Sequence, residues 1–193
     1  MSEQSDRPLV VAVVGSPRAR GNTSLLTDVV LGELQRMGAA VVKLRLADYD
    51  VAPCLGHDGC ADFARCPQGD DAERLLATVY GADGLLLATP VYYENVSAQM
   101  KAFIDRNVFQ YAHDVFLHPK VVGLLVVTAE SGLEDTLAAL RRYVALSTQE
   151  DVPVVSMGGF ADKAGEAVAD PELVAAARQL AADMAGPLGL SAA

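Results

Sequence analysis

Five short apolar runs, each followed by a segment with helical periodicity, constrain the fold of this chain more than any other feature. Residues 85–87 and 121–127 are apolar or glycine throughout, instead of alternating between apolar and polar. Strands have this composition when helices cover both faces of a parallel sheet. The sequence therefore predicts a parallel sheet with strands at residues 9–14, 40–46, 84–88, 121–128 and 153–157.

The segments between these strands carry apolar residues three or four positions apart, as on one face of an amphipathic helix. Asp170-Pro171 is a typical start for the last of them, and Gly186-Pro187 a typical end. Strands that alternate with helices in this way predict a doubly wound α/β fold, with helices on both faces of the sheet. We expect residues 1–193 to form a single domain. The predicted helices cover residues 25–37, 71–80, 96–104, 133–144 and 173–184.

The chain is strongly acidic, with 15 Lys and Arg residues against 25 Asp and Glu and a formal net charge of −10. This balance argues against nucleic acid and against an anionic membrane surface as partners, because both attract basic residues. No apolar run approaches the roughly 18 residues of a membrane span. The three cysteines all lie between positions 54 and 66, which is unlike a secreted disulfide framework. Together these features predict a cytoplasmic protein.

The loop after the first predicted strand reads Gly-Ser-Pro-Arg-Ala-Arg-Gly-Asn-Thr, residues 15–23. It lacks the second glycine of the dinucleotide pattern G-x-G-x-x-G and the lysine of the pattern G-x-x-x-x-G-K-[ST]. A helix start with free backbone N–H groups and the positive charge of Arg18 instead suits a terminal monophosphate. The alternative is an ordinary strand–helix turn capped by Asn22 or Thr23. The polar side chains offered as further donors are Ser16, Asn22, Thr23 and Ser24.

Two later loops are expected at the same edge of the sheet, where ligands of such folds bind. In the first of them, Pro90 stiffens the turn, and Tyr92 and Tyr93 would flank a flat ring by stacking or else be ordinary surface tyrosines. In the second, Thr128 or Ser131 is expected to cap the following helix and not to contact a ligand.

Three stretches together resemble the NADPH-dependent FMN reductase family, and most closely its iron–sulfur flavoprotein branch. They are the loop at residues 15–23, Ala-Thr-Pro-Val-Tyr-Tyr at 88–93, and Val-Ser-Ala-Gln-Met-Lys-Ala-Phe-Ile-Asp-Arg at 96–106. The similarity runs from position 9 to about position 180. It implies a flavodoxin-like fold, a five-stranded parallel sheet in the order 2-1-3-4-5 with FMN in the crevice at its edge.

The resemblance also implies which residues would hold FMN. The phosphate would be held by Ser16, Arg18, Asn22, Thr23 and Ser24. The isoalloxazine would lie along Pro90, Val91, Tyr92 and Tyr93. Glu94 stands where the family often has glycine, so its carboxylate would either repel an anionic reduced flavin or point to solvent.

The implied activity is electron transfer from NADH or NADPH, through bound FMN, to a free flavin, a quinone or another small acceptor. Hydride transfer needs no side-chain acid or base, so no catalytic residue is assigned. Two alternatives stay open: an FMN electron carrier for a partner enzyme, and an FMN-dependent dehydrogenase or oxidase of a specialised metabolite. The family resemblance further implies a homodimer or homotetramer.

Residues 53–71, here called the cysteine segment, hold Cys54, His57, Cys60 and Cys66. The resemblance implies a four-cysteine cluster pattern, C-x2-C-x2-C-x5-C, in which this chain has histidine at the second position. Three cysteines and one histidine suit an iron–sulfur cluster with one histidine ligand, and equally a structural zinc site. The third possibility, which we favour, is that no metal binds and the thiols pack or react.

Overall fold

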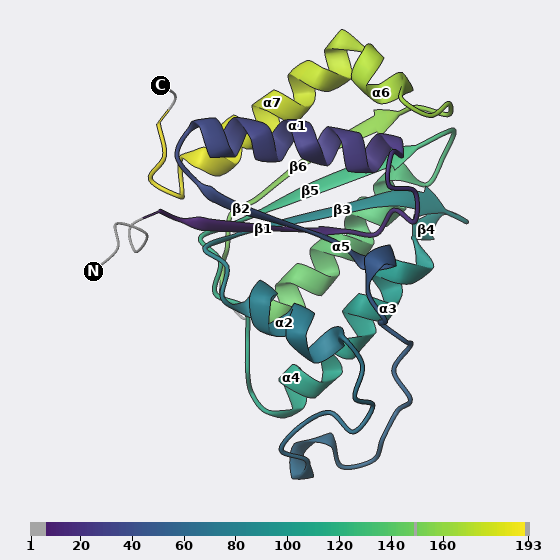
Figure 1. Cartoon of the computed structure of the whole chain (residues 1–193), viewed down its shortest axis with the longest axis vertical. Coiled ribbons are helices and arrows are strands. Elements are labelled where there is room, and N and C mark those ends of the chain that lie inside the picture. The colour runs from purple at the N-terminus through teal and green to yellow at the C-terminus, as the bar shows by residue number, and fades with distance from the viewer. Residues whose placement is uncertain (1–6, 149, 192–193) are drawn as a thin grey trace.

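The computed structural model describes residues 7–148 and 150–191, and it places a sheet between two layers of helices. Figure 1 shows α1, α6 and α7 on one face and α2, α3, α4 and α5 on the other. The strands are β1 (Leu9–Val14), β2 (Ala40–Arg45), β3 (Gly84–Tyr92), β4 (Asn95–Val96), β5 (Val121–Thr128) and β6 (Val154–Phe160). The helices are α1 (Asn22–Arg36), η1 (Leu46–Asp48), η2 (Cys60–Asp62), α2 (Ala72–Tyr80), α3 (Ala98–Arg106), α4 (Val108–Ala112), α5 (Leu133–Thr148), α6 (Glu166–Ala169) and α7 (Pro171–Ala185).

The sheet has the order β2-β1-β3-β5-β6, and all four of these pairings are parallel. The predicted order 2-1-3-4-5 is this order once β4 is added to the numbering. The prediction of five strands needs a correction, because β4 forms a sixth strand that pairs antiparallel with the end of β3. β3 also continues four residues beyond its predicted end at Ala88. Pro90 does not stop it, because β1 ends opposite Ala88 and the missing proline N–H has no ladder partner to lose.

The last strand is longer than predicted, since Gly158 and Gly159 continue it to Phe160. Both glycines lie where a helix approaches the sheet closely. A Cβ atom added at Gly158 would lie 2.6 Å from Leu133 of α5, and one at Gly159 would lie 2.8 Å from Leu173 of α7. The helices on the two faces can therefore pack this close to β6 because these two positions have no side chain.

Successive residues of β1 point into two separate cores, as the unbroken apolar runs predict. Val10 and Ala12 pack with α1 and α7, whereas Val11 and Val13 pack with α2, α3 and α5. All four are fully buried, and that burial is the main force that fixes the strand. The predicted start of α7 is also confirmed, because the Asp170 side chain accepts hydrogen bonds from the N–H groups of Glu172 and Leu173. Among the described residues, no helix is long and apolar enough to cross a membrane.

Candidate functional site

The N-terminus of α1 leaves backbone donors without acceptors. Its N-cap residue is Gly21, which has no side chain that could accept a hydrogen bond from the N–H groups of the first turn. The first N–H at this end that bonds to a backbone carbonyl is that of Leu25, whose acceptor is Gly21 O at 3.0 Å. The N–H groups of Asn22, Thr23 and Ser24 therefore point out of the helix end, where the helix dipole also favours an anion. The alternative of a turn capped by Asn22 or Thr23 is wrong.

A cavity of about 190 Å³, called the α1 cavity, opens at this helix end. Its walls come from the loops after β1, β5 and β6 and from the ends of β3 and β5, that is, from the carboxyl edge of the sheet as predicted. The residues that line it are Ser16, Arg18, Gly21, Asn22, Thr23, Pro90, Val91, Tyr92, Val127, Thr128, Ala129, Ala161 and Asp162.

Three of the predicted phosphate ligands present side chains to the α1 cavity. Ser16 is nearly buried, and its hydroxyl bonds only to the backbone of Arg18, at 3.3 Å. The Thr23 hydroxyl has no hydrogen bond to another described residue. The exposed Arg18 guanidinium likewise makes no ion pair or hydrogen bond within the described part of the chain. These groups can therefore bind a ligand without giving up a strong internal contact.

The side chains of the other two predicted phosphate ligands, Asn22 and Ser24, are already hydrogen-bonded to other parts of the chain. Asn22 donates to the carbonyl oxygens of Ala161 (3.3 Å) and Lys163 (2.9 Å) and accepts from the N–H of Ala167 (3.3 Å). The Ser24 hydroxyl is buried outside the α1 cavity and accepts from Lys43 Nζ at 2.9 Å. Only the backbone N–H groups of Asn22 and Ser24 remain for an anion.

The loop from Ala161 to Glu166 forms the cavity wall that sequence reasoning missed. Besides its contacts with Asn22, it is shaped by Glu166, whose carboxylate accepts the N–H groups of Asp162 and Lys163, both at 2.9 Å. The two hydrogen bonds stabilise the carboxylate and hold the pKa of Glu166 below its ordinary value, with the larger contribution from Lys163. Nothing in the pattern of the last strand signals this wall, because it depends on a side chain more than a hundred residues earlier in the chain.

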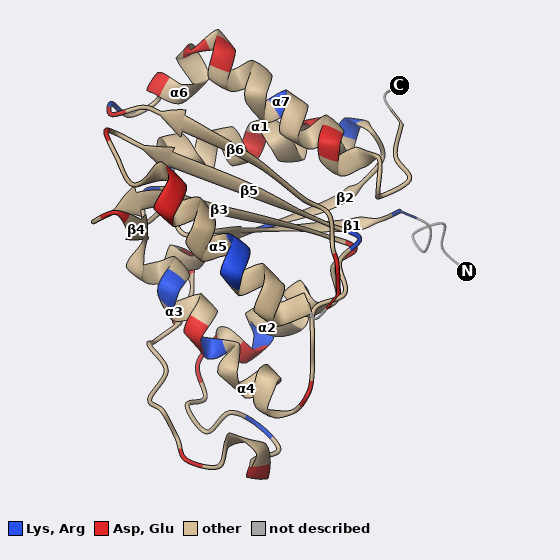
Figure 2. Cartoon of the chain, turned by 180° about the vertical axis from the view of Figure 1, so that it is seen from behind, with Lys and Arg blue, Asp and Glu red and all other residues tan. Residues whose placement is uncertain are grey.

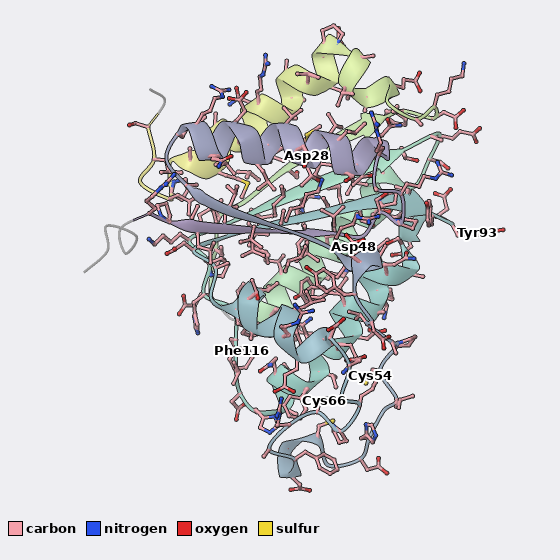
Figure 3. The ribbon with its side chains drawn as sticks, in the orientation of Figure 1. Asp28, Asp48, Cys54, Cys66, Tyr93 and Phe116 are labelled. Carbon is pink, nitrogen blue, oxygen red and sulfur yellow. The ribbon has the colours of Figure 1, made fainter. Side chains whose placement is uncertain are left out.

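Tyr93 and Glu94 do not line the α1 cavity. They form the two-residue turn between β3 and β4, with φ of 49° and 62°. Left-handed backbone costs a residue other than glycine on the order of 1 kcal/mol or more. Tyr93 is fully exposed and projects away from the fold (Figure 3), so it does not flank the cavity as predicted.

Glu94 is anchored instead of pointing freely to solvent. Its carboxylate accepts a hydrogen bond from the Ser131 hydroxyl at 2.5 Å, and its Cα would lie only 2.7 Å from a Cβ added at Gly132. Ser131 therefore holds the β3–β4 turn and does not cap α5. Thr128 does not cap the helix either, because its hydroxyl donates to Ser131 O and accepts from the N–H of Glu130 within the loop.

The buried hydroxyl groups of Thr89 and Ser97, which sequence reasoning missed, connect the loop after β1 to the end of β3 and the start of α3. Ser97 Oγ donates to Gly15 O (2.7 Å) and accepts from the N–H of Met100, which caps α3. The Ser97 N–H in turn donates to Thr89 Oγ1 at 3.1 Å. A Cβ at Gly15 would lie 2.7 Å from Ser97 Oγ and 2.9 Å from Met100. The loop after β1, which lines the α1 cavity, is thus held firmly against the start of α3. The sequence did hold a signal for this helix cap, because Ser97 stands three residues before Met100 at the start of an amphipathic helix.

The cysteine segment lies away from the α1 cavity, in the long connection between η1 and α2 (Figures 1 and 3). Across the described residues, no three His, Cys, Asp or Glu side chains lie close enough together to hold a metal ion. Cys60 donates to the backbone oxygen of His57, and Cys66 accepts from Arg106. As arranged, Cys54, His57, Cys60 and Cys66 do not fit a four-ligand cluster or a zinc site.

Arg106, part of the stretch that carries the resemblance, is buried beneath the cysteine segment and pairs with Asp70. Burial opposes the charge on Asp70. The hydrogen bonds from Arg106, Ala72 and Ala52 outweigh it and hold the pKa of this carboxyl below its ordinary value of 3.8.

Comparison with known proteins finds one family model and several relatives that match most of the chain. Residues 8–165 match the family described as NADPH-dependent FMN reductase. An iron-sulfur flavoprotein of Archaeoglobus fulgidus is 39% identical over 163 residues, covering 84% of this chain and 73% of that protein. An iron-sulfur flavoprotein of Methanocaldococcus jannaschii is 32% identical over 161 residues, covering 78% and 80%.

Among solved structures, RosB with bound 8-demethyl-8-formylriboflavin-5′-phosphate is similar in fold. Its TM-score is 0.74 at 17% sequence identity, and the match covers 94% of this chain and 79% of that one. At this identity the likeness extends to the fold alone.

The close contact of Gly15 with Ser97 and Met100 can be tested with two glycine-to-alanine substitutions. Gly15→Ala should lower the free energy of unfolding by about 1–3 kcal/mol, because the new methyl overlaps Ser97 and Met100. Gly32→Ala is the control, since no atom lies within 4 Å of its Cβ and it sits inside α1. It should raise the stability by roughly 0.5–1 kcal/mol. Urea unfolding measures both, and equal effects would contradict the close contact.

Proposed function

The chain belongs to the NADPH-dependent FMN reductase family, and from this membership we propose that it is an FMN-dependent oxidoreductase that takes electrons from NADH or NADPH and passes them to a small acceptor. The observation that supports this most is the α1 cavity. It brings together helix N–H groups without backbone acceptors and a Ser16 hydroxyl that bonds only to the Arg18 backbone. It also holds the Thr23 hydroxyl and the Arg18 guanidinium, neither of which has a side-chain partner in the described part of the chain. A phosphate monoester meets all three kinds of donor.

The residues fit FMN in two parts. The phosphate would bind the N–H groups of residues 22–24, with Ser16, Thr23 and Arg18 around it. The ring system would lie along Pro90, Val91 and Tyr92, where β3 passes the end of β1. A cavity of about 190 Å³ is smaller than the 300–1,000 Å³ typical of pockets that enclose a ligand. The ring would therefore lie partly outside it, with one face open.

Bound FMN would supply the redox chemistry, accepting hydride from the nicotinamide and delivering electrons to the second substrate. The chain's own part is to bind and orient it. The contact between Gly15 and Ser97 fixes the loop after β1 against the start of α3, and the Ser131–Glu94 hydrogen bond fixes the turn beside the ring. Because one open face serves both the nicotinamide and the acceptor, the two would react in turn. A free flavin or a quinone is flat enough for that position.

Purified protein tests the proposal directly. It should be yellow, or take up added FMN, and anaerobic NADH or NADPH should bleach the flavin absorbance. A protein that stays colourless after reconstitution with FMN would exclude the function. If the cofactor binds but neither nicotinamide reduces it, the FMN site stands and the donor is wrong.

If Arg18 binds the phosphate of FMN, replacing it should weaken the binding of FMN but not the binding of riboflavin. Arg18→Ala should raise the Kd for FMN by about ten- to a hundredfold, because a charge-assisted hydrogen bond is lost. The Kd for riboflavin, which has no phosphate, should stay nearly constant. Arg20→Ala removes another exposed arginine of the same loop that does not line the α1 cavity, and it should leave both constants unchanged. Fluorescence titration measures them, and equal losses for FMN and riboflavin would show that the phosphate lies elsewhere.

An electron carrier is the second candidate, and the net charge of −10 favours it. Figure 2 shows acidic residues on several helices and loops, and the excess of negative charge would attract a basic partner. Steady-state oxidation of NADPH with a quinone separates the candidates. Many turnovers per minute support the reductase. Slow turnover together with fast oxidation of the photoreduced protein by a redox partner supports the carrier.

We also propose that the chain forms a homo-oligomer through α4 and α5. Val108, Tyr111 and Leu146 are exposed there beside an apolar cavity of about 710 Å³. Burying such a surface would favour association. Leu146→Asp should shift the mass measured by light scattering toward the monomer, whereas Ala145→Asp, exposed but outside the cavity, should not. A wild-type protein that is monomeric at micromolar concentration would refute the oligomer.

A further inference from the structure

Arg106 joins both ends of the cysteine segment. It is the last residue of α3, and its side chain is only 3% exposed. Its Nη1 donates to Ala52 O at 3.2 Å and pairs with the Asp70 carboxylate, and its Nη2 donates to Cys66 Sγ at 3.3 Å. One guanidinium thus contacts the residue before the segment, a cysteine within it, and an aspartate near its end.

Asp70 completes this network from the other side. Its carboxylate, 6% exposed, accepts the N–H groups of Ala52 and Ala72, both at 3.1 Å. Gln68 adds a bond from Nε2 to Pro53 O at 2.9 Å. The entry and the exit of the segment are therefore held together by hydrogen bonds and one buried ion pair, without a contribution from Cys54, His57 or Cys60.

This arrangement competes with a metal centre. A cluster or zinc site needs its ligands to converge on one point, and in the described chain no such group exists. In the structure the Cys66 sulfur instead accepts a hydrogen bond from Arg106 at 3.3 Å, and the Cys60 sulfur donates to the backbone oxygen of His57. The two thiols therefore have separate partners and do not share a common centre.

We propose that Arg106 is the organising cation of the cysteine segment, with Asp70, the Ala52 carbonyl and the Cys66 sulfur as its ligands, and that the segment holds neither an iron–sulfur cluster nor zinc. The closed form of the segment is then intrinsic to the polypeptide. All three cysteines are partly exposed, and Cys66 is the only one of them whose sulfur contacts a cation among the described residues.

The wild-type protein tests the metal half of the proposal. After anaerobic purification, and again after incubation with ferrous iron and sulfide, bound iron, acid-labile sulfide and zinc should all be substoichiometric. Hydrogen exchange of residues 53–71 should be the same with and without a chelator. Stoichiometric iron with sulfide, stoichiometric zinc, or a segment that exchanges faster in chelator would each overturn the proposal.

Hydrogen exchange, mapped by mass spectrometry, tests the arginine half. In Arg106→Met the amides of residues 53–71 should exchange about tenfold or more faster than in wild type, because the buried ion pair that joins the two ends of the segment is lost. Exchange in the buried strand β1 should change little. Lys101→Met is the matched control on the same helix, since its ion pair with Asp105 is exposed.

A conservative variant keeps the test informative if Arg106→Met fails to fold. Arg106→Lys retains the charge beside Asp70 but lacks the planar fork that reaches Cys66 at the same time. Exchange of residues 53–71 should become faster in this variant while the melting temperature changes less than in Arg106→Met. Exchange of this segment that stays at the wild-type rate in the folded Arg106 variants would refute the role of Arg106.

Discussion

The close approach of Gly15 to Ser97 is the contact on which the candidate site depends. It joins the loop after β1 to the start of α3 and leaves no room for a side chain at position 15. Because that loop leads directly into α1, the contact also sets where the helix begins and where its N–H groups point. The position of Pro90 and Val91 follows from the same contact, since Thr89 binds the N–H of Ser97. Both parts of the proposed FMN site therefore share one buried anchor.

Sequence reasoning predicted the features that depend on local pattern. Unbroken apolar runs gave the five parallel strands, because burial on both faces removes the usual alternation. The start of α7 at Asp170 followed from its capping chemistry. The last strand was predicted too short, since glycines 158 and 159 are poor strand formers in isolation and are explained only by the helices that pack over them. Tertiary packing decided those positions.

The site was predicted at the level of loops but not of every side chain. Ser16, Arg18 and Thr23 lie where an anion would bind, whereas Asn22 and Ser24 have contacts with distant partners that no local motif reveals. The cysteine segment makes the same point more strongly. Its spacing suits a metal site, but the structure instead uses an arginine some forty residues beyond Cys66. Spacing constrains which side chains can meet, and the surrounding fold decides which of them do.

Asn22 links the beginning of the chain to its last third. Its side chain bonds to residues 161, 163 and 167, so one wall of the α1 cavity is supplied by a segment about 140 positions away. Contacts with such large sequence separation form late, because a long loop must close before they are gained. During synthesis on the ribosome, the phosphate loop would emerge early and remain an incomplete receptor until β6 and the loop after it had docked. The capacity to retain a nucleotide would thus be among the last properties acquired by the maturing polypeptide.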